Sequence, residues 1–194
     1  MAQLINEIAS IIRKIEFVKK KSLIYKLIRN TGIIISKSVF PKGIKKTLGN
    51  FGKFRFSHEF AFYDFDSWGK GKNNGFNKLV DLAVGKETVF DIGAHIGLCS
   101  MPISRVLNEG GRCYAFEPAK ANIMFLKQHL KMNNINNVHV IESLVGDERL
   151  ERVGFYEMNG DSGMNTISRV KKGEIEYKEI FKSQITIDGF VKES

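Results

Sequence analysis

The chain has 194 residues, 43% of them hydrophobic, which is enough for one ordinary globular domain with a sizeable core. Its formal net charge of +9 is unevenly distributed. Residues 1–50 carry eleven Lys and Arg against two Glu, whereas residues 51–194 carry nineteen basic and nineteen acidic residues. The sequence shows no basic recognition helix, zinc-finger pattern or aromatic RNA-binding sheet, so we expect no nucleic-acid partner.

Cysteine and hydropathy patterns exclude further classes of protein. Cys99 and Cys113 lack the paired Cys or His spacing of a metal site, so we expect no metal and interpret both as small buried hydrophobic residues in a reducing compartment. No uncharged apolar run approaches the roughly 18–20 residues that a membrane-spanning helix needs. The N-terminus lacks the pattern of a secretory signal. These features predict a cytoplasmic protein.

Residues 1–50 are expected to form a basic helical extension and a linker. Apolar residues recur at helical spacing over residues 3–29, which predicts one bent helix or two. Gly32 and Pro41 then indicate an irregular segment. Two interpretations of the helical part stay open: packing on the domain or on a partner chain, or peripheral contact of residues 1–30 with an anionic membrane surface. The oligomeric state also stays open.

An aromatic segment follows the linker. Phe54 and Phe56 have the same parity as Phe60 and Phe62, with a turn at residues 57–58 between the two pairs. This pattern predicts a hairpin with one buried aromatic face.

The remaining elements follow from apolar periodicity and turn residues. The expected strands are 88–92, 112–116, 138–141, 153–158 and 185–187. The expected helices are 76–84 before Gly85, 98–108 before Gly110-Gly111, a helix from Pro118 to Asn133-Asn134, and a charged helix-like stretch around 171–181, with an exposed loop at 69–75. Alternating strands and helices predict an α/β fold.

Acidic residues stand at the ends of the first two expected parallel strands. Asp91 lies just before a turn at residues 93–97, and Glu117 follows the next strand. In such a unit the turn leaves backbone N–H groups free at a helix N-terminus, and the second acid can accept both hydroxyls of a ribose. The layout predicts a nucleotide site.

The residues of the turn select among nucleotides. A dinucleotide turn needs glycine at the positions that hold His95 and Leu98, so a pyrophosphate loses its steric basis. An acid two residues before Gly93 suits a ligand with an ammonium group instead. S-adenosylmethionine carries an ammonium, a sulfonium and a ribose, without a phosphate.

Three segments resemble a known family: VFDIGAHIG at 89–97, YAFEPAKANIMFLKQHLKMNN at 114–134 and NVHVIESLVGDE at 137–148. They are similar to the FkbM family of S-adenosylmethionine-dependent methyltransferases, over roughly residues 53–191. The resemblance implies a Rossmann-like class I methyltransferase fold. It also implies methyl transfer from S-adenosylmethionine, most often to a hydroxyl of a sugar or other small metabolite.

We expect Glu117 to bind the ribose, and Asp91 either to hold the ammonium, directly or through water, or to pin the turn. Gly93 and Gly97 allow the tight turn and close ligand approach. The residues after the third strand are expected near the adenine, with Glu142 accepting its amino group. The expected cofactor-binding residues are Asp91, Gly93, Ala94, His95, Gly97, Glu117, Pro118, Asn122, Glu142, Ser143 and Leu144.

The family pattern continues, after a segment like residues 185–190, into a strand that carries its candidate catalytic acids. The chain ends at Ser194, before such a strand. The resemblance therefore implies an incomplete methyltransferase domain over residues 51–194, with the first half of the sheet in strand order 3-2-1, strand 88–92 at an open edge and no assignable base. The alternatives are a catalytically inactive S-adenosylmethionine-binding fragment or regulatory module, and an NAD-dependent oxidoreductase.

Overall fold

The computed structural model describes residues 23–71, 74–158 and 177–193. The elements in chain order are α2 (Leu23–Val39), β1 (Ile44–Thr47), β2 (Lys53–Phe56), η1 (His58–Phe60), α3 (Gly75–Ala83), β3 (Thr88–Ile92), α4 (Ser100–Ile103), β4 (Arg112–Phe116), α5 (Lys120–Met132), β5 (Val138–Ile141), β6 (Leu144–Val145), β7 (Leu150–Met158), β8 (Tyr177–Ile185) and α6 (Ile187–Glu193).

The described chain divides into two compact units. The first comprises residues up to Leu79 together with 131–134, and the second comprises residues 80–130 and those from Ile135 onward.

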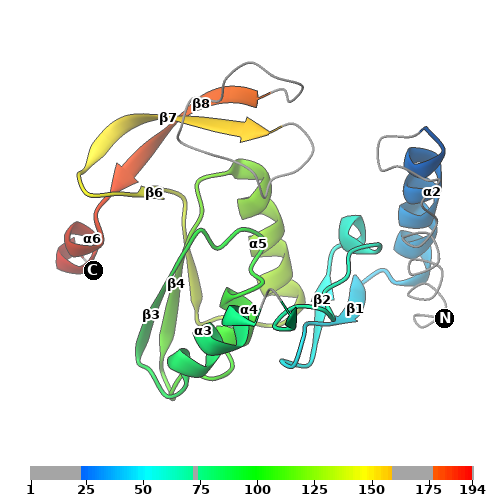
Figure 1. Ribbon diagram of the computed structural model, residues 1–194, viewed down its shortest axis with the longest axis horizontal. Helices are drawn as coiled ribbons and strands as arrows, with labels where there is room; N and C mark the ends of the chain where they lie inside the picture. The colour runs from blue at the N-terminus through cyan, green and yellow to red at the C-terminus, as the bar shows by residue number, and fades with distance from the viewer. Residues whose placement is uncertain (1–22, 72–73, 159–176, 194) are drawn as a thin grey trace. The chain divides into compact units, whose positions relative to one another are not determined.

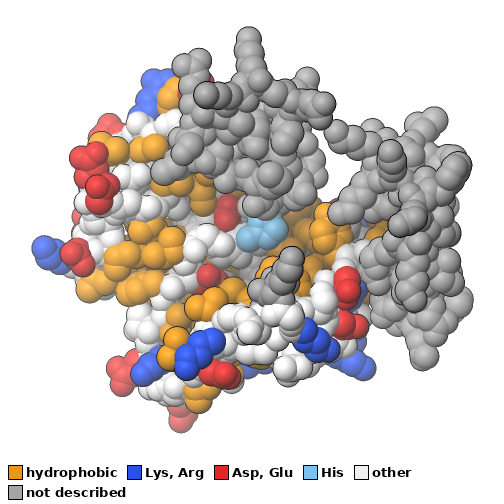
Figure 2. Space-filling view, viewed as in Figure 1, with side chains coloured by type: hydrophobic (Ala, Val, Ile, Leu, Met, Phe, Trp, Pro, Cys, Tyr) orange, Lys and Arg blue, Asp and Glu red, His pale blue; other side chains and the backbone are white. Residues whose placement is uncertain are grey.

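Acidic and basic side chains are interspersed on the face of the described residues that Figure 2 shows. None of the described helices is long and apolar enough to cross a membrane.

The second unit contains a parallel sheet of β3, β4 and β5, in that order (Figure 1). Thr88 lies opposite Arg112, and Phe116 lies opposite Ile141. All three strands have the bounds expected from the sequence, because each is a short apolar run that ends at a turn former or an acid. The expected α/β class and the 3-2-1 strand order are therefore confirmed. Among the described residues, β3 forms the edge of this sheet.

The core of the second unit lies around this sheet. Side chains that are at most 1% exposed include Ile96, Met101, Cys113, Ala115 and Leu126. Phe190 of α6 lies edge-on to the rings of Phe90, Tyr114 and Phe116, with ring centroids 5.1 to 6.2 Å apart. An aromatic cluster from two strands and one short helix therefore covers part of one sheet face.

The helix expected over residues 98–108 is shorter than predicted. Only Ser100–Ile103 are α-helical, and the N–H of Val106 then bonds to the carbonyl of Ile103, three residues back, at 3.0 Å. Such bonds tighten the chain into turns. The expected helix after Pro118 is confirmed as α5, and α3 ends before Gly85, whose φ is 69°.

A second sheet in this unit has the order β6-β8-β7, with β8 parallel to β6 and antiparallel to β7. The strand expected at 153–158 is confirmed within β7. The helix-like stretch expected around 171–181 is wrong in its described part, which belongs to β8, and the remainder lies outside the described residues. The strand expected at 185–187 is wrong beyond Ile185, the last residue of β8, because α6 begins at Ile187. Pairing with β7 overrides the local charge pattern.

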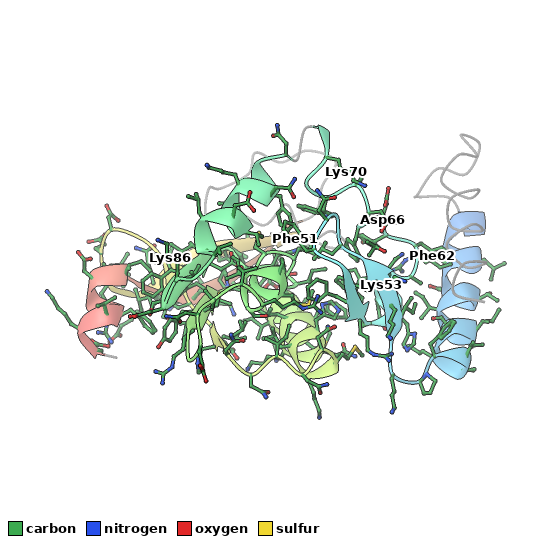
Figure 3. The ribbon with its side chains drawn as sticks, turned by 90° about the horizontal axis from the view of Figure 1, so that it is seen from below. Phe51, Lys53, Phe62, Asp66, Lys70 and Lys86 are labelled. Carbon is green, nitrogen blue, oxygen red and sulfur yellow. The ribbon has the colours of Figure 1, made fainter. Side chains whose placement is uncertain are left out.

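In the first unit, α2 continues through Gly32 to Val39, so the irregular segment expected there is wrong. A Cβ on Gly32 would lie 2.4 Å from Cζ of Phe62, which Figure 3 shows beside α2. Close approach therefore explains a glycine that costs helical stability in other settings. Most of the helix expected over 3–29 lies outside the described residues.

The β2 strand pairs with β1 in an antiparallel hairpin, in which Ile44 lies opposite Phe56. The chain does turn after Ser57, but the hairpin expected across residues 57–58 is wrong, because His58–Phe60 form the short 3-10 helix η1 and β2 pairs with β1 instead. Phe54 and Phe56 are buried, as expected of an aromatic core. A boundary at residue 50 falls between the two strands of this hairpin.

Candidate cofactor site

Glu117, just after β4, connects two loops through its carboxylate and is only 5% exposed. Its Oε2 accepts a hydrogen bond of 2.8 Å from the backbone N–H of His95 in the turn after β3. Its Oε1 accepts bonds from the N–H of Ala119 at 2.9 Å and from Nδ2 of Asn122 at 3.0 Å. Because a carboxylate offers about four acceptor sites, these bonds fix its orientation and leave capacity for another donor.

The amides of the turn after β3 donate inside the protein. The N–H groups of Gly93 and Ala94 both donate to the carbonyl of Phe116, at 2.9 and 3.0 Å, and that of Gly97 donates to Ala94 at 2.8 Å. The expectation of free N–H groups is wrong for these residues, because the last carbonyl of β4 reaches the turn. A pyrophosphate would have to compete with these bonds, which adds to the case against a dinucleotide.

Three residues of the turn have a left-handed backbone, with φ of 82° at Gly93, 52° at His95 and 93° at Gly97. A Cβ on Gly97 would lie 2.8 Å from Cδ1 of Leu126, so the turn packs closely on α5. A Cβ on Gly93 would meet no atom of the described residues within 4 Å. Gly93 therefore leaves room for a ligand at the carboxyl end of β3.

Asp91 of β3 accepts a hydrogen bond of 2.5 Å from the hydroxyl of Ser100, which is completely buried at the start of α4. Burial raises the pKa of Asp91 above its ordinary value of 3.8, the Ser100 bond opposes this rise, and the negative charge of Glu117 adds to it. Ser100 was not expected at the site, although a hydroxyl residue soon after a glycine turn was a usable signal in the sequence. Two interacting carboxylates thus favour a cation at this site.

Burial raises the pKa of both thiols, Cys99 and Cys113, to about 12, and the charge of Asp91 adds to this rise. Both cysteines are free, and such thiols stay protonated and unreactive at neutral pH. Across the described ranges, no cluster of three or more His, Cys, Asp and Glu could hold a metal ion.

The residues after β5 are held by other partners. The side chain of Glu142 is 52% exposed and lies 2.6 Å from Nζ of Lys127 on α5, and this hydrogen bond lowers its pKa. Ser143 is buried, with Oγ 3.0 and 2.9 Å from the carbonyls of Leu144 and Ser183. The structure therefore ties the Ser143 hydroxyl to β8 rather than to the turn.

Asn122 is 2% exposed, and its Oδ1 finds no hydrogen-bond partner within the part of the chain that the structure describes. A buried acceptor in this state is suited to receive a bond from a ligand or a water. The expected residues that lie in the turn or beside Glu117 are Asp91, Gly93, Ala94, His95, Gly97, Pro118 and Asn122. Glu142, Ser143 and Leu144 engage α5 and β8 instead.

No family model matches the chain, and no curated protein matches it either. Among solved structures, it is similar to an rRNA methylase from Streptococcus thermophilus, with 17% identity, a TM-score of 0.33 and coverage of 37% of this chain and 38% of that chain. It is also similar to a methyltransferase from Geobacter sulfurreducens, with 19% identity, a TM-score of 0.34 and coverage of 36% of this chain and 38% of that chain. A third similar structure is a precorrin-6y C5,15-methyltransferase from Geobacter metallireducens, with 23% identity, a TM-score of 0.33 and coverage of 37% of this chain and 39% of that chain. The match spans well under half of each of these chains, and TM-scores this low do not establish a common fold. The fold class rests on the strand order and register of β3, β4 and β5.

Proposed function

We propose that this chain is an S-adenosylmethionine-dependent methyltransferase domain of the FkbM type. The observation that carries the proposal is the position of Glu117, whose buried carboxylate follows the second strand of a parallel sheet and is oriented by three donors. An acid at this place accepts ribose hydroxyls in nucleotide-binding α/β proteins. The D-I-G-A-H-I-G and F-E-P-A-K-A-N motifs narrow the proposal to the FkbM type.

The chemistry of the site suits S-adenosylmethionine. Asp91 and Glu117 accept bonds from neutral donors, which leave both negative charges in place, and the free Oδ1 of Asn122 adds another acceptor. Acceptors of this kind match an ammonium and ribose hydroxyls. The amides of Gly93 and Ala94, which a phosphate would need, are already bonded to Phe116.

Each group of the cofactor then has a proposed partner. Asp91 holds the ammonium and Glu117 holds the ribose hydroxyls. Glu142, whose Oε1 is paired with Lys127, accepts from the adenine amino group through its other oxygen. When bound, S-adenosylmethionine supplies a methyl group on a sulfonium, which is already a good leaving group. The protein aligns an acceptor hydroxyl of a sugar or other small metabolite, whose proton a base helps to remove. We assign that base to no described residue.

The test is calorimetric binding of S-adenosylhomocysteine to the whole chain. Glu117→Gln keeps the size of the side chain but removes its charge. It also replaces one of the two acceptor oxygens with an NH2 group, which can only donate. We expect the variant to bind S-adenosylhomocysteine with a free energy less favourable by about 1.5–3 kcal/mol, the range for hydrogen bonds that involve a charged group. Glu109→Gln, which neutralises an exposed acid of the same unit, is the matched control and should bind like the wild type.

Three outcomes separate the alternatives. Equal affinity of wild type and Glu117→Gln contradicts the assigned site. Tight binding of NAD with no binding of S-adenosylhomocysteine favours an oxidoreductase. Binding of S-adenosylhomocysteine without methyl transfer to any hydroxyl in a panel of sugars and small metabolites favours a binding or regulatory module.

A further inference from the structure

Helix α2 is attached to the first unit along one face. The guanidinium of Arg29 donates to the carbonyl of Glu59 at 3.4 Å, and Nζ of Lys37 lies 3.2 Å from the Glu59 carboxylate. Oγ of Ser36, which is completely buried, lies 3.1 Å from Nδ1 of His58. These residues, with Gly32 between them, recur at helical spacing and define the attached face.

The opposite side of α2 exposes several large apolar side chains. Leu27 and Ile34 are each 67% exposed, Ile35 is 53% exposed and Val39 is 39% exposed. Residues 27, 34 and 35 are separated by seven and eight positions, so they lie on one side of the helix. We name Leu27, Ile34 and Ile35 the outer face of α2; Val39, seven residues after Gly32, lies nearer to the attached face. Several large apolar side chains exposed on one side of a helix indicate a contact site.

The charged residues of the segment that carries the outer face indicate what kind of partner it binds. Residues 23–50 contain six Lys and Arg and no Asp or Glu. Lys42 and Lys45 are exposed among them. By contrast, the exposed Leu79 and Leu82 of α3 lie on a helix that carries both a Lys and an Asp. The outer face therefore lies on a segment, residues 23–50, whose own charged residues are all basic, with Lys37 among them paired to Glu59.

We propose that the outer face of α2 binds the surface of an anionic phospholipid bilayer. A helix with apolar residues on one side and basic residues around them lies in the plane of the interface, with the apolar side toward the acyl chains. The basic residues then lie near the negative headgroups, each contributing to affinity. This assignment is independent of the methyltransferase proposal.

The test is sedimentation of the full chain with phosphatidylcholine vesicles, with and without about 30% phosphatidylglycerol. Wild type should bind the anionic vesicles, bind pure phosphatidylcholine far more weakly, and lose affinity as salt rises from about 0.1 to 0.5 M. The double variant Ile34→Ser/Ile35→Ser should reduce the partition coefficient by at least about tenfold. The control Leu79→Ser/Leu82→Ser removes the same number of exposed apolar side chains from α3 and should change it less than about twofold.

A charge pair completes the experiment. Lys42→Gln/Lys45→Gln should weaken partitioning by about fivefold for each charge, the contribution of one basic residue near an anionic surface. Lys86→Gln/Lys192→Gln removes two exposed charges of the other unit and should have a smaller effect.

Four results would overturn the proposal. These are no binding of wild type to anionic vesicles, equal binding to neutral ones, partitioning unchanged by Ile34→Ser/Ile35→Ser, or a wild-type dimer that this variant converts to a monomer in light scattering. The last result would assign the outer face to a second copy of the chain. The lipid-charge and salt series use wild type alone, so the proposal stays falsifiable even if a variant folds poorly.

Discussion

Asp91 and Glu117 lie at the ends of neighbouring strands. Burial raises the pKa of the Asp91 carboxyl group. Its raised pKa means that the native protein holds the Asp91 proton more tightly than the unfolded chain does. The ionised form therefore costs stability, and that cost increases as the pH rises from about 3.8 through the folded-state pKa. A charge kept at such a cost is a common feature of binding sites.

We predict that Asp91→Asn stabilises the protein at neutral pH and abolishes cofactor binding. Asparagine can still accept the Ser100 bond but carries no charge. The melting temperature of the variant relative to wild type should rise between about pH 4 and pH 8, because only wild type loses stability on ionisation. Asp81→Asn, at an exposed position, should show no such trend. A difference that does not change with pH would contradict the role given to burial.

Gly97 provides a second prediction, because it combines a positive φ with close packing. Alanine at Gly97 suffers both the left-handed backbone and the contact of 2.8 Å with buried Leu126. Gly110 has a φ of 78° but open space around it, so Gly110→Ala isolates the backbone effect. In urea denaturation, Gly97→Ala should lose about 1–3 kcal/mol more than Gly110→Ala. Equal losses would mean that the contact with α5 relaxes freely.

The position of Glu117 could be predicted from the sequence, because an apolar run with a known direction places the following acid at the edge of the sheet. The use of the Gly93 and Ala94 amides could not. Those bonds depend on the register of β3 and β4, which brings the Phe116 carbonyl to the turn. The anchoring of Ser143 depends in the same way on β8, which lies forty residues further along the chain.

At the scale of elements, strands β3, β4 and β5 were predictable because their apolar runs are short and clearly bounded. β1 was not, because its sequence IKKT contains two lysines. Lys46 is nonetheless 6% exposed, and its ammonium donates to the carbonyls of Ala61 and Tyr63 at 2.7 and 2.6 Å. A buried charge satisfied by carbonyls from a distant segment leaves no local signal.

The attachment of α2 to η1 should depend on pH through His58. Burial lowers the pKa of His58 below its ordinary value of 6.5, Glu59 opposes this shift, and Lys37 adds to it. A base with a lowered pKa stabilises the fold fully above about pH 6.5, and that stability is lost as the pH falls toward the folded-state value. The Ser36 hydroxyl donates to the carbonyl of Ile33, so Nδ1 of His58 carries the proton of their shared bond.

We therefore predict that hydrogen-exchange protection factors of the α2 amides fall below about pH 6.5 in wild type. His58→Asn keeps a donor near Ser36 but cannot be protonated, so its protection factors should stay constant over the same range. The exchange of α5 amides serves as an internal control. A parallel loss of protection in His58→Asn would show that another group loosens α2.

At the scale of the whole molecule, the charge distribution distinguishes a basic N-terminal segment from the charge-balanced remainder that contains the proposed cofactor site. Residues 1–50 hold the entire basic excess of +9, whereas residues 51–194 are balanced and contain every residue of the proposed cofactor site. The structure adds that the exposed apolar side chains of α2 accompany that excess. Composition could predict the asymmetry, but only the attachment of Ser36 and Lys37 to η1 shows which face of the helix is left exposed.

The last prediction is that the two proposed activities can be removed independently in the full chain. Ile34→Ser/Ile35→Ser should leave the affinity for S-adenosylhomocysteine within about twofold of wild type, because these side chains belong to the first unit whereas the turn and Glu117 belong to the second. Glu117→Gln should likewise leave partitioning onto anionic vesicles unchanged. Calorimetry and sedimentation on the same preparations measure both quantities. If either variant changed both affinities by tenfold, the lipid surface and the cofactor would be thermodynamically coupled, and linkage requires that coupling to act equally in the two directions.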